Sequence, residues 1–385
     1  MAITETFVRF VRSEQSAGIV LVVSTLIALA ITNSALGASY VGFWESEVGG
    51  LTLVHWVNDA LMAVFFLFIG LELERELYVG ELSEPRKALF PMFAAIGGMI
   101  APALIHYSFN AGTPAQSGFG IPMATDIAFA LGALALLGSR VPAALKVFLV
   151  AFAVIDDLGA IVIIATFYTS KLSAIYLAGA IGMWVVLILL NRVFQVVALF
   201  PYLLGGVVLW ILMLKSGVHA TLAGVMLAFA IPFTNRHGVS PSHRLENVLH
   251  KPVAFLILPI FALANAGIHI DAEWGQGLWS ANSLGIALGL VIGKPLGVTA
   301  LCFVAAWAGI CRMPPELRWS HIAGAGILGG IGFTMAIFIT NLAFTANAYT
   351  ANQSKMAVLL ASLTAGILGV VWLRLFPRPV GVKGK

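Results

Sequence analysis

Long apolar segments separated by short polar ones recur along this chain from one end to the other. A helix needs about 20 apolar residues to cross the hydrocarbon core of a bilayer, because each residue advances it by only about 1.5 Å. The chain is therefore predicted to be an all-α polytopic membrane protein with twelve transmembrane helices. They fall near residues 17–34, 52–76, 87–108, 117–138, 143–169, 172–190, 194–213, 217–233, 249–269, 283–309, 320–345 and 356–375.

The amino-acid composition agrees with this interpretation. Hydrophobic residues make up 60% of the 385 positions and charged residues only 10%, which is typical of a membrane protein. No polar stretch is long enough to fold as a separate soluble domain, so we predict one integral membrane domain over residues 1–385. Within it, residues 1–16 are predicted to be a cytoplasmic interfacial segment and residues 376–385 a cytoplasmic C-terminal tail.

Positive charges are distributed unevenly between the two sides of the predicted membrane. Most of the 21 Lys and Arg residues lie on the side of the termini, whereas Lys171, Lys215 and Lys355 fall on the other side. Loops rich in Lys and Arg stay in the cytoplasm, so both termini are predicted to be cytoplasmic. This asymmetry explains the formal net charge of +4 without a nucleic-acid partner. The first apolar run could instead be the core of a cleaved signal peptide, which would leave one helix fewer.

Two predicted helices contain residues that interrupt a helix. The fourth carries Gly118-Phe-Gly-Ile-Pro122 shortly before Thr125 and Asp126, and the eleventh carries Gly326-Ile-Leu-Gly-Gly-Ile-Gly-Phe-Thr334. The fourth is the middle of helices 3–5 and the eleventh is the middle of helices 10–12. This pairing predicts inverted repeats whose two interrupted helices cross near the middle of the membrane. Irregular backbone is tolerated there only where protein or water covers it, so the breaks mark a candidate binding site.

Charged residues occur deep inside three predicted helices. Asp126 lies in the fourth, Asp156 and Asp157 in the fifth, and Lys294 in the tenth. A charge at the bilayer centre costs about 2.5 to 3.5 kcal/mol or more, so such residues indicate an ion or proton pathway. Asp126 and Lys294 are expected to compensate the partial charges of the broken helix ends. Pro295 is expected to keep Lys294 out of the ordinary helical conformation.

The adjacent aspartates should have different partners, because neighbouring helical residues point about 100° apart. We expect Asp157 to face a water-accessible cavity as an ion ligand and Asp156 to face Lys294 or a second helix. Na+ and Li+ prefer oxygen ligands, which both aspartates, Thr125 and unwound carbonyl groups can supply. A proton and a cation would then compete for one site, and activity should rise on leaving acidic conditions.

Four short motifs carry these residues: Ala124-Thr-Asp-Ile-Ala-Phe-Ala130, Val154-Ile-Asp-Asp-Leu-Gly159, Ile292-Gly-Lys-Pro-Leu296 and Gly329-Gly-Ile-Gly-Phe-Thr-Met335. Together they resemble the NhaA-type sodium/proton antiporters, and the resemblance spans nearly the whole chain. It implies electrogenic exchange of Na+ or Li+ for protons in the bacterial cytoplasmic (inner) membrane, with no cofactor beyond the transported ions.

The resemblance also assigns roles to individual residues. It implies that Asp156 and Asp157 are the ion and proton site, that Thr125 and Asp126 belong to the helix crossing, and that Lys294 interacts with that assembly. It implies a pH-sensing region at the cytoplasmic end of the protein. The residues that correspond to this region are Glu72, Arg75, Glu76, Glu246 and His250, and the resemblance also implicates His219 in the pH response.

Several features leave the sensing region open to another interpretation. Glu74 stands where the best-known relative has a lysine and Asn247 where it has a histidine, so the pH threshold is expected to differ. A solvated helix end with local ion pairs is the alternative for Glu72, Arg75 and Glu76, and the histidines can be satisfied polar residues. The loop after the first helix is short in this chain, whereas the family can use that region as a β-hairpin in dimer contacts, and a homodimer is what the resemblance alone implies.

Other functions were weighed against the antiporter. A Na+-coupled solute symporter is the closest alternative, since it can also use broken helices and buried charges, and a channel is a further one. A membrane enzyme is not expected, because Asp156-Asp157 is followed by Leu-Gly-Ala and lacks the third acid of a diphosphate-binding motif. An antiporter needs only an opposing proton gradient, whereas a symporter requires an organic substrate.

Overall fold

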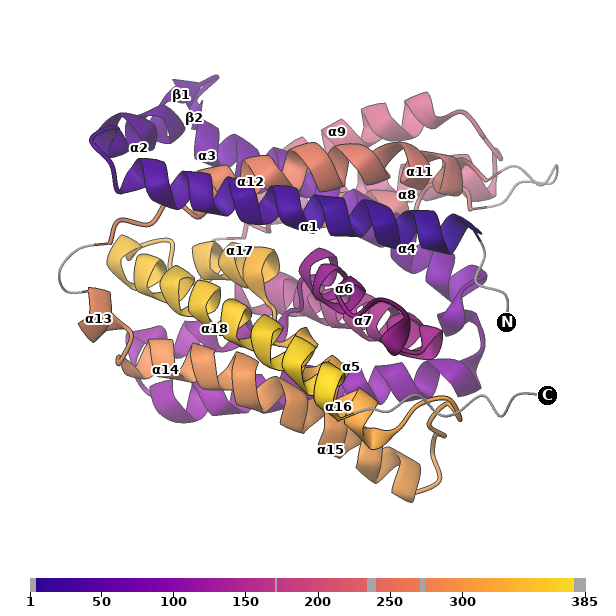
Figure 1. Cartoon of the computed structure of the whole chain (residues 1–385). Helices are drawn as coiled ribbons and strands as arrows, with labels where there is room; N and C mark the ends of the chain where they lie inside the picture. Colours follow the sequence, from indigo (N-terminus) through magenta and orange to yellow (C-terminus); the bar gives the residue numbers. More distant parts are fainter. Residues whose placement is uncertain (1–4, 170–171, 234–239, 271–273, 377–385) are drawn as a thin grey trace. The chain divides into compact units, whose positions relative to one another are not determined.

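A computed structural model of the protein describes residues 5–169, 172–233, 240–270 and 274–376 (Figure 1). This part of the chain is almost entirely helical, which confirms the predicted all-α membrane fold. The first four residues of the predicted interfacial segment and residues 377–385 of the predicted tail lie outside it. Residues Glu5–Thr32 form one continuous helix, α1, which joins the rest of that segment to the first predicted transmembrane helix.

The chain divides into two compact units, and each is described by itself. The first unit comprises Met1–Val23, Glu81–Ala160 and Ile268–Lys385. Its core contains Phe90, Phe152 and Leu328, which are all buried. It holds the start of α1, α5 (Pro85–Asn110), α6 (Ile127–Ala135), most of α7 (Ala143–Phe167), α13 (Trp274–Gly277), α14 (Ala281–Leu288), α15 (Lys294–Trp307), α16 (Trp319–Gly329), α17 (Phe333–Ala343) and α18 (Ala348–Leu375), with 3-10 helices at Glu81–Ser83, Pro114–Met123 and Gly138–Arg140.

The second unit comprises Ser24–Gly80 and Ile161–Gly267. Its core contains Leu71, Leu187 and Tyr202. It holds the end of α1, α2 (Gly37–Glu45), β1 (Glu47–Val48), β2 (Leu51–Thr52), α3 (Leu53–His55), α4 (Met62–Tyr78), the end of α7, α8 (Ala174–Arg192), α9 (Leu199–Ser216), α10 (Leu222–Ala228), α11 (Pro241–Pro252) and α12 (Leu258–Asn265). The single membrane domain stays a prediction.

The number of helices that can cross a membrane is lower than the twelve expected. In the described ranges, eight helices are long and apolar enough, or up to eleven if each bent pair counts as one. The predicted helix at 217–233 contains only α10, whose seven residues are too short to span a bilayer. Gly217 ends α9 in the left-handed conformation, with φ of 82°, and α10 begins only at Leu222.

The two predicted helix breaks are present. Pro114–Met123 and α6 are bent by 44° relative to each other, and α16 and α17 by 47°. Ala124 and Asp126 have extended backbone between the first pair of segments. A third bent pair, at 114°, joins Ser16–Thr32 to α2 and was not expected from the sequence.

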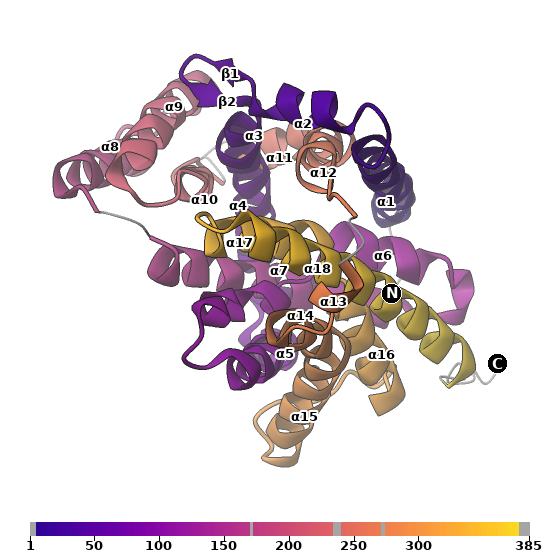
Figure 2. The same ribbon diagram turned by 90° about the vertical axis from the view of Figure 1, so that its left-hand side faces the viewer.

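The first helices of the two predicted repeats pack closely and run antiparallel (Figures 1 and 2). A Cβ on Gly97 of α5 would lie 2.1 Å from the carbonyl oxygen of Gly297 on α15, and one on Gly293 would lie 3.1 Å from Cα of Pro102. Rising residue numbers on α5 therefore meet falling numbers on α15, the arrangement that inverted repeats require. Asn282 of α14 adds polar contacts, to His106 Nε2 at 3.0 Å and to Ser354 Oγ at 2.7 Å.

Three of the membrane-spanning helices contain a π-helical turn, at Trp56–Leu61, Val253–Ile257 and Gly289–Gly293. Such turns are rare and occur frequently at functional sites. Lys294 follows the third turn with φ of −62° and ψ of −56°, so the expectation that Pro295 keeps it out of the helical conformation is wrong. Pro295 therefore lies inside the continuous span Ala281–Trp307, directly after the π turn, where its missing N–H removes one hydrogen bond of the helix.

A short hairpin follows α2. Glu47 pairs with Thr52 and Val48 with Leu51, and the turn between them is Gly49-Gly50, with φ of 64° and 81°. Two consecutive positive φ values define the tight turn that suits antiparallel strands, and glycine adopts them without strain. A short hairpin is therefore present in the loop where this chain was expected to differ from the family, whereas the homodimer stays a prediction.

Candidate functional site

The two interrupted helices of the first unit meet through their backbones. Thr125 Oγ1 donates a hydrogen bond to the carbonyl oxygen of Gly329 at 2.9 Å, and the N–H of Asp126 donates to the carbonyl oxygen of Ile331 at 2.7 Å. Both acceptors lie at the break between α16 and α17. The breaks therefore satisfy part of each other's hydrogen-bonding needs, as buried irregular backbone must.

Asp126 serves two helix ends at once. Its side chain accepts from the N–H of Phe129, in the first turn of α6, at 3.2 Å. It also accepts from the N–H and the hydroxyl of Thr334, in the first turn of α17, at 3.1 and 2.5 Å. A helix N-terminus carries partial positive charge, so one carboxylate compensates two such ends. Asp126 was expected to act as such a compensator, but its contact with Thr334 was not foreseen.

Lys294 supplies the opposite compensation. Its ammonium donates to the carbonyl oxygen of Met123, the last residue of the helix Pro114–Met123, and to Asp156 Oδ2 at 2.6 Å. Helix C-termini carry partial negative charge, which the ammonium offsets. Lys294 and Asp156 are both 0% exposed, so the pair lies in a medium where an unpaired charge would be costly. Of the two aspartates, Asp156 is thus the partner of Lys294, as expected.

Asp157 completes the group of buried charges. Its residue is 2% exposed, and it interacts electrostatically with Lys294. Over the residues that the structure describes, no cluster of three or more His, Cys, Asp or Glu side chains could hold a metal ion. A cation bound at Asp157 or Asp156 would therefore need hydroxyl or carbonyl oxygens as further ligands. The role of Asp157 as an ion ligand stays a prediction.

The formal charges around the crossing do not balance. Asp126, Asp156 and Asp157 contribute three carboxylates, and Lys294 contributes one ammonium ion. The two N-terminal helix ends at Asp126 offset part of the excess negative charge. The remaining negative charge favours uptake of a proton or a small cation, because an uncompensated buried charge is unfavourable.

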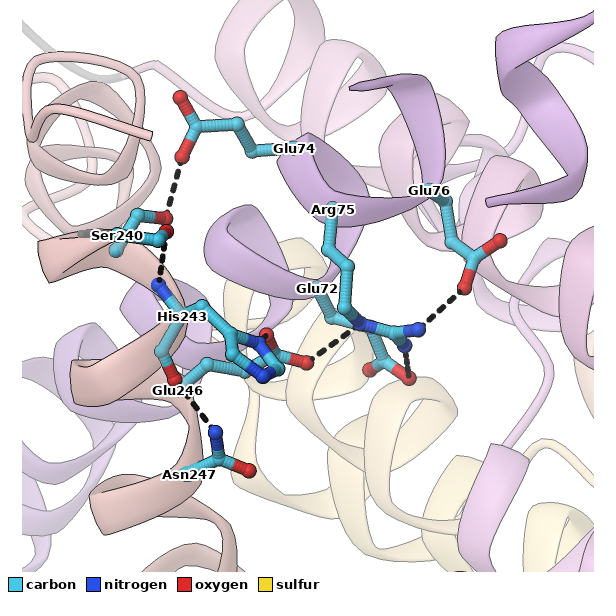
Figure 3. A network of polar contacts seen from close by, with 9 residues as sticks. Glu72, Glu74, Arg75, Glu76, Ser240, His243, Glu246 and Asn247 are labelled. Atoms are coloured by element: carbon cyan, nitrogen blue, oxygen red, sulfur yellow. Dashed lines mark hydrogen bonds and ion pairs between the residues drawn. The ribbon is translucent and has the colours of Figure 1, made fainter. Parts of the chain in front are cut away.

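A second polar group lies in the second unit, at the end of α4 and the start of α11 (Figure 3). Arg75 forms ion pairs with Glu246 at 2.8 Å, Glu76 at 3.0 Å and Glu72 at 3.7 Å. The three carboxylate residues are buried, whereas the Arg75 side chain is 29% exposed. Four of the six predicted sensing residues are thus brought together, with the local ion pairs of the alternative but with buried carboxylates, and their part in pH sensing stays a prediction.

Two further contacts extend this group and were missed from the sequence. His243 Nδ1 lies 3.1 Å from Glu246 Oε2, and the Ser242 hydroxyl donates to Glu74 Oε2 at 2.5 Å. The spacing of three residues between His243 and Glu246 on one helix was the available signal for the first contact. No comparable signal existed for the second, which joins residues far apart in the chain. We call the eight residues Glu72, Glu74, Arg75, Glu76, Ser242, His243, Glu246 and Asn247 the carboxylate network.

The other two predicted sensing residues lie elsewhere in the second unit. The ring of His250 packs edge-on against Phe68, with 5.8 Å between ring centroids. His219 lies in the turn between α9 and α10 and is hydrogen-bonded to the backbone of Tyr168. The structure therefore gives both histidines packing or structural contacts, and their part in pH sensing stays a prediction.

Comparison with known proteins supports the resemblance found in the motifs. Residues 8–373 match the family described as Na+/H+ antiporter 1. Three similar proteins are each named Na(+)/H(+) antiporter NhaA. The protein of Dechloromonas aromatica is 64% identical over 98% of this chain and 97% of its own length, that of Cytophaga hutchinsonii is 58% identical over 97% and 96%, and that of Vibrio campbellii is 51% identical over 94% of both.

Proposed function

This chain belongs to the Na+/H+ antiporter 1 family, and from that premise we propose that it exports Na+, or Li+ in its place, in exchange for protons by alternating access. We place it in the bacterial cytoplasmic membrane with both termini in the cytoplasm, on the basis of the uneven distribution of Lys and Arg. The observation that carries the proposal is the buried pair of Lys294 and Asp156 beside Asp157, at the crossing of two broken helices.

Competition between protons and Na+ follows from this geometry. A carboxylate at Asp157 must lose its proton before it can bind a cation, and it regains one when the cation leaves. If the site opens to one side of the membrane and then to the other, this exclusion alone produces exchange. No separate proton pathway and no cofactor are needed.

Electrogenic exchange requires that more protons move inward than Na+ ions move outward. The site offers three groups that can hold a proton, Asp156, Asp157 and Lys294, for one bound cation. When Na+ binds at Asp157, the ion pair of Lys294 and Asp156 can rearrange and release a further proton, which is taken up again when Na+ leaves. Such coupled groups titrate together, so the extra proton belongs to the assembly rather than to one residue.

The carboxylate network supports the proposed dependence on pH. Three buried glutamates, Glu72, Glu76 and Glu246, share Arg75, so three carboxylates surround one partly exposed cation. We propose that a change in the charge of this cluster with pH biases the second unit between less active and more active conformations. Activity is expected to rise on leaving acidic conditions.

The test is Na+-triggered proton movement in proteoliposomes over a range of pH, without any organic solute. Asp157→Asn keeps the size of the side chain and removes its charge, so exchange should fall to the level of empty liposomes. The control is Glu84→Gln, which neutralises a carboxylate in an exposed pair with Lys87 and should exchange like the wild type at matched incorporation. Retained exchange in Asp157→Asn would move the site elsewhere, and exchange that needs an organic solute would favour a symporter.

A further inference from the structure

The first turn of α16 is closed by a histidine. The N–H of Arg318, the residue just before the helix, donates to His321 Nδ1 at 3.0 Å. This is one half of a capping box, in which the third residue of a helix accepts from the N–H of the capping residue. Glutamate or glutamine usually fills this position, and neither changes its role as acceptor between pH 6 and 8.

This contact fixes the protonation state of the imidazole. A nitrogen that accepts a hydrogen bond cannot carry a proton, so the ring is neutral and its hydrogen is on Nε2. His321 is 1% exposed, and its buried Nε2 has no hydrogen-bond partner among the residues that the structure describes. A second proton could bind only at Nδ1, and it would break the bond to Arg318.

The charges near His321 oppose that proton further. The N-terminus of α16 carries partial positive charge, and Arg318 acts on His321 by electrostatic repulsion. The charged and histidine side chains on the preceding segment and on the elements that pack against α16 are Arg312, Glu316 and Arg318, Lys355 and Arg374 on α18, Arg86, Lys87 and His106 on α5, Lys294 on α15 and Asp126 before α6. Of these, Arg318 is the one with a resolved effect on His321.

The other end of α16 lies at the helix crossing. Gly329, its last residue, accepts the hydrogen bond from Thr125, which lies beside Asp156. A Cβ on Gly326 would lie 2.8 Å from Cα of Pro295, directly after Lys294, and one on Gly330 would lie 2.3 Å from the carbonyl oxygen of Leu290. Contacts this close couple the register of α16 to the position of Pro295, next to Lys294, and of Thr125, beside Asp156.

We propose that His321 is a positioning residue whose neutral imidazole holds the first turn of α16 in register, and that acid releases this turn. The proton binds the uncapped conformer, in which the ring is free to leave its buried place and titrates near the ordinary histidine value of about 6.5. Capping is therefore complete above that pH and is lost progressively below it. This inference concerns the pH response of the proposed transport site and so rests on the proposed function.

Hydrogen exchange of the full-length protein in lipid nanodiscs tests the cap without relying on transport. The wild type is compared with His321→Gln, which keeps an acceptor but cannot be protonated, and with His321→Leu, which has no acceptor. At pH 8, residues 318–322 should exchange alike in the wild type and His321→Gln, and about fivefold faster in His321→Leu. At pH about 6, below the ordinary histidine pKa, the wild type should approach His321→Leu while His321→Gln stays protected.

Proteoliposome exchange provides the second measurement. His321→Gln should match the wild type at alkaline pH and retain several-fold more activity at acidic pH, whereas His55→Gln, which removes a more exposed histidine from α3, should match the wild type throughout. Equal protection of wild type and His321→Gln at both pH values would overturn the inference, even if His321→Leu failed to fold. If the protected and released states appeared but no variant transported Na+, the proposed function would fail while the cap stood.

Discussion

The helix crossing of the first unit and the carboxylate network of the second unit both bury several acids around a single cation, but they differ in how the charges are compensated. At the crossing, Asp126 and Lys294 each bind both a backbone group at a helix end and a side chain. In the network, Arg75 is 29% exposed and is shared by three glutamates. The charges at the crossing are thus bonded to specific buried partners, whereas the acids of the network share one partly exposed cation.

The largest effect is expected from Lys294→Met, which keeps the length of the side chain and removes its charge. Asp156 would then be a buried carboxylate without its counterion, at a cost of about 3 to 5 kcal/mol in the free energy of unfolding. Thermal and denaturant unfolding of the purified protein measure this loss. The double variant Asp156→Asn with Lys294→Met should recover much of the lost free energy of unfolding. A double variant as unstable as Lys294→Met alone would contradict the compensation of Asp156 by Lys294.

A smaller effect is expected from Thr334→Val, which removes one hydrogen bond to the Asp126 carboxylate. A bond to a charged group contributes about 1.5 to 3 kcal/mol, so the free energy of unfolding should fall by that amount. Thr340→Val is the matched control on the same helix, because Thr340 donates only to the carbonyl oxygen of Ala336. Equal losses in both variants would show that Asp126 does not depend on Thr334.

The smallest effect on stability, but a distinct effect on pH dependence, is expected from Arg75→Gln. Partial exposure of Arg75 limits the loss to about 1 kcal/mol. Without this cation the buried glutamates give up protons less readily, so the rise of transport activity should move to higher pH. Proteoliposome exchange from acidic to alkaline pH measures the shift, with Lys87→Gln as the exposed control. An unchanged pH profile would remove the functional difference between the two regions.

Much of the crossing could be predicted from the sequence, because a charged residue within a long apolar segment is rare and easily recognised. Asp126, Asp156 and Lys294 interrupt apolar runs, and glycines mark both breaks, with Pro122 at the first one. Such patterns indicate that groups meet, but not which atoms bond. The contact of Thr334 with Asp126 depends on the relative position of two helix ends. The spacing of residues along the chain does not predict that position to within a hydrogen-bond length.

The network and the helix count were harder to predict for a different reason. Ser242 and His243 come from a polar segment, where a solvated surface is the ordinary expectation, and only tertiary packing brings Ser242 to Glu74. The segment at 217–233 is apolar enough for a membrane helix, yet its described structure is mainly turns around α10. Hydropathy reports the environment of a segment and does not report its conformation, so short or broken helices are overcounted.

The π turn at Gly289–Gly293 bears on relatives whose chain is one residue shorter or longer at this point of the helix. A regular α-helix over the same residues would rotate Lys294 by about 100° relative to α14, so Asn282 and Lys294 could not both reach their partners. The π turn accommodates one extra residue within the helix, so both side chains keep the directions that their contacts require. We therefore expect that a relative one residue shorter at this point has a straight helix with both contacts intact, and that a one-residue gap in an alignment here is compatible with a working site.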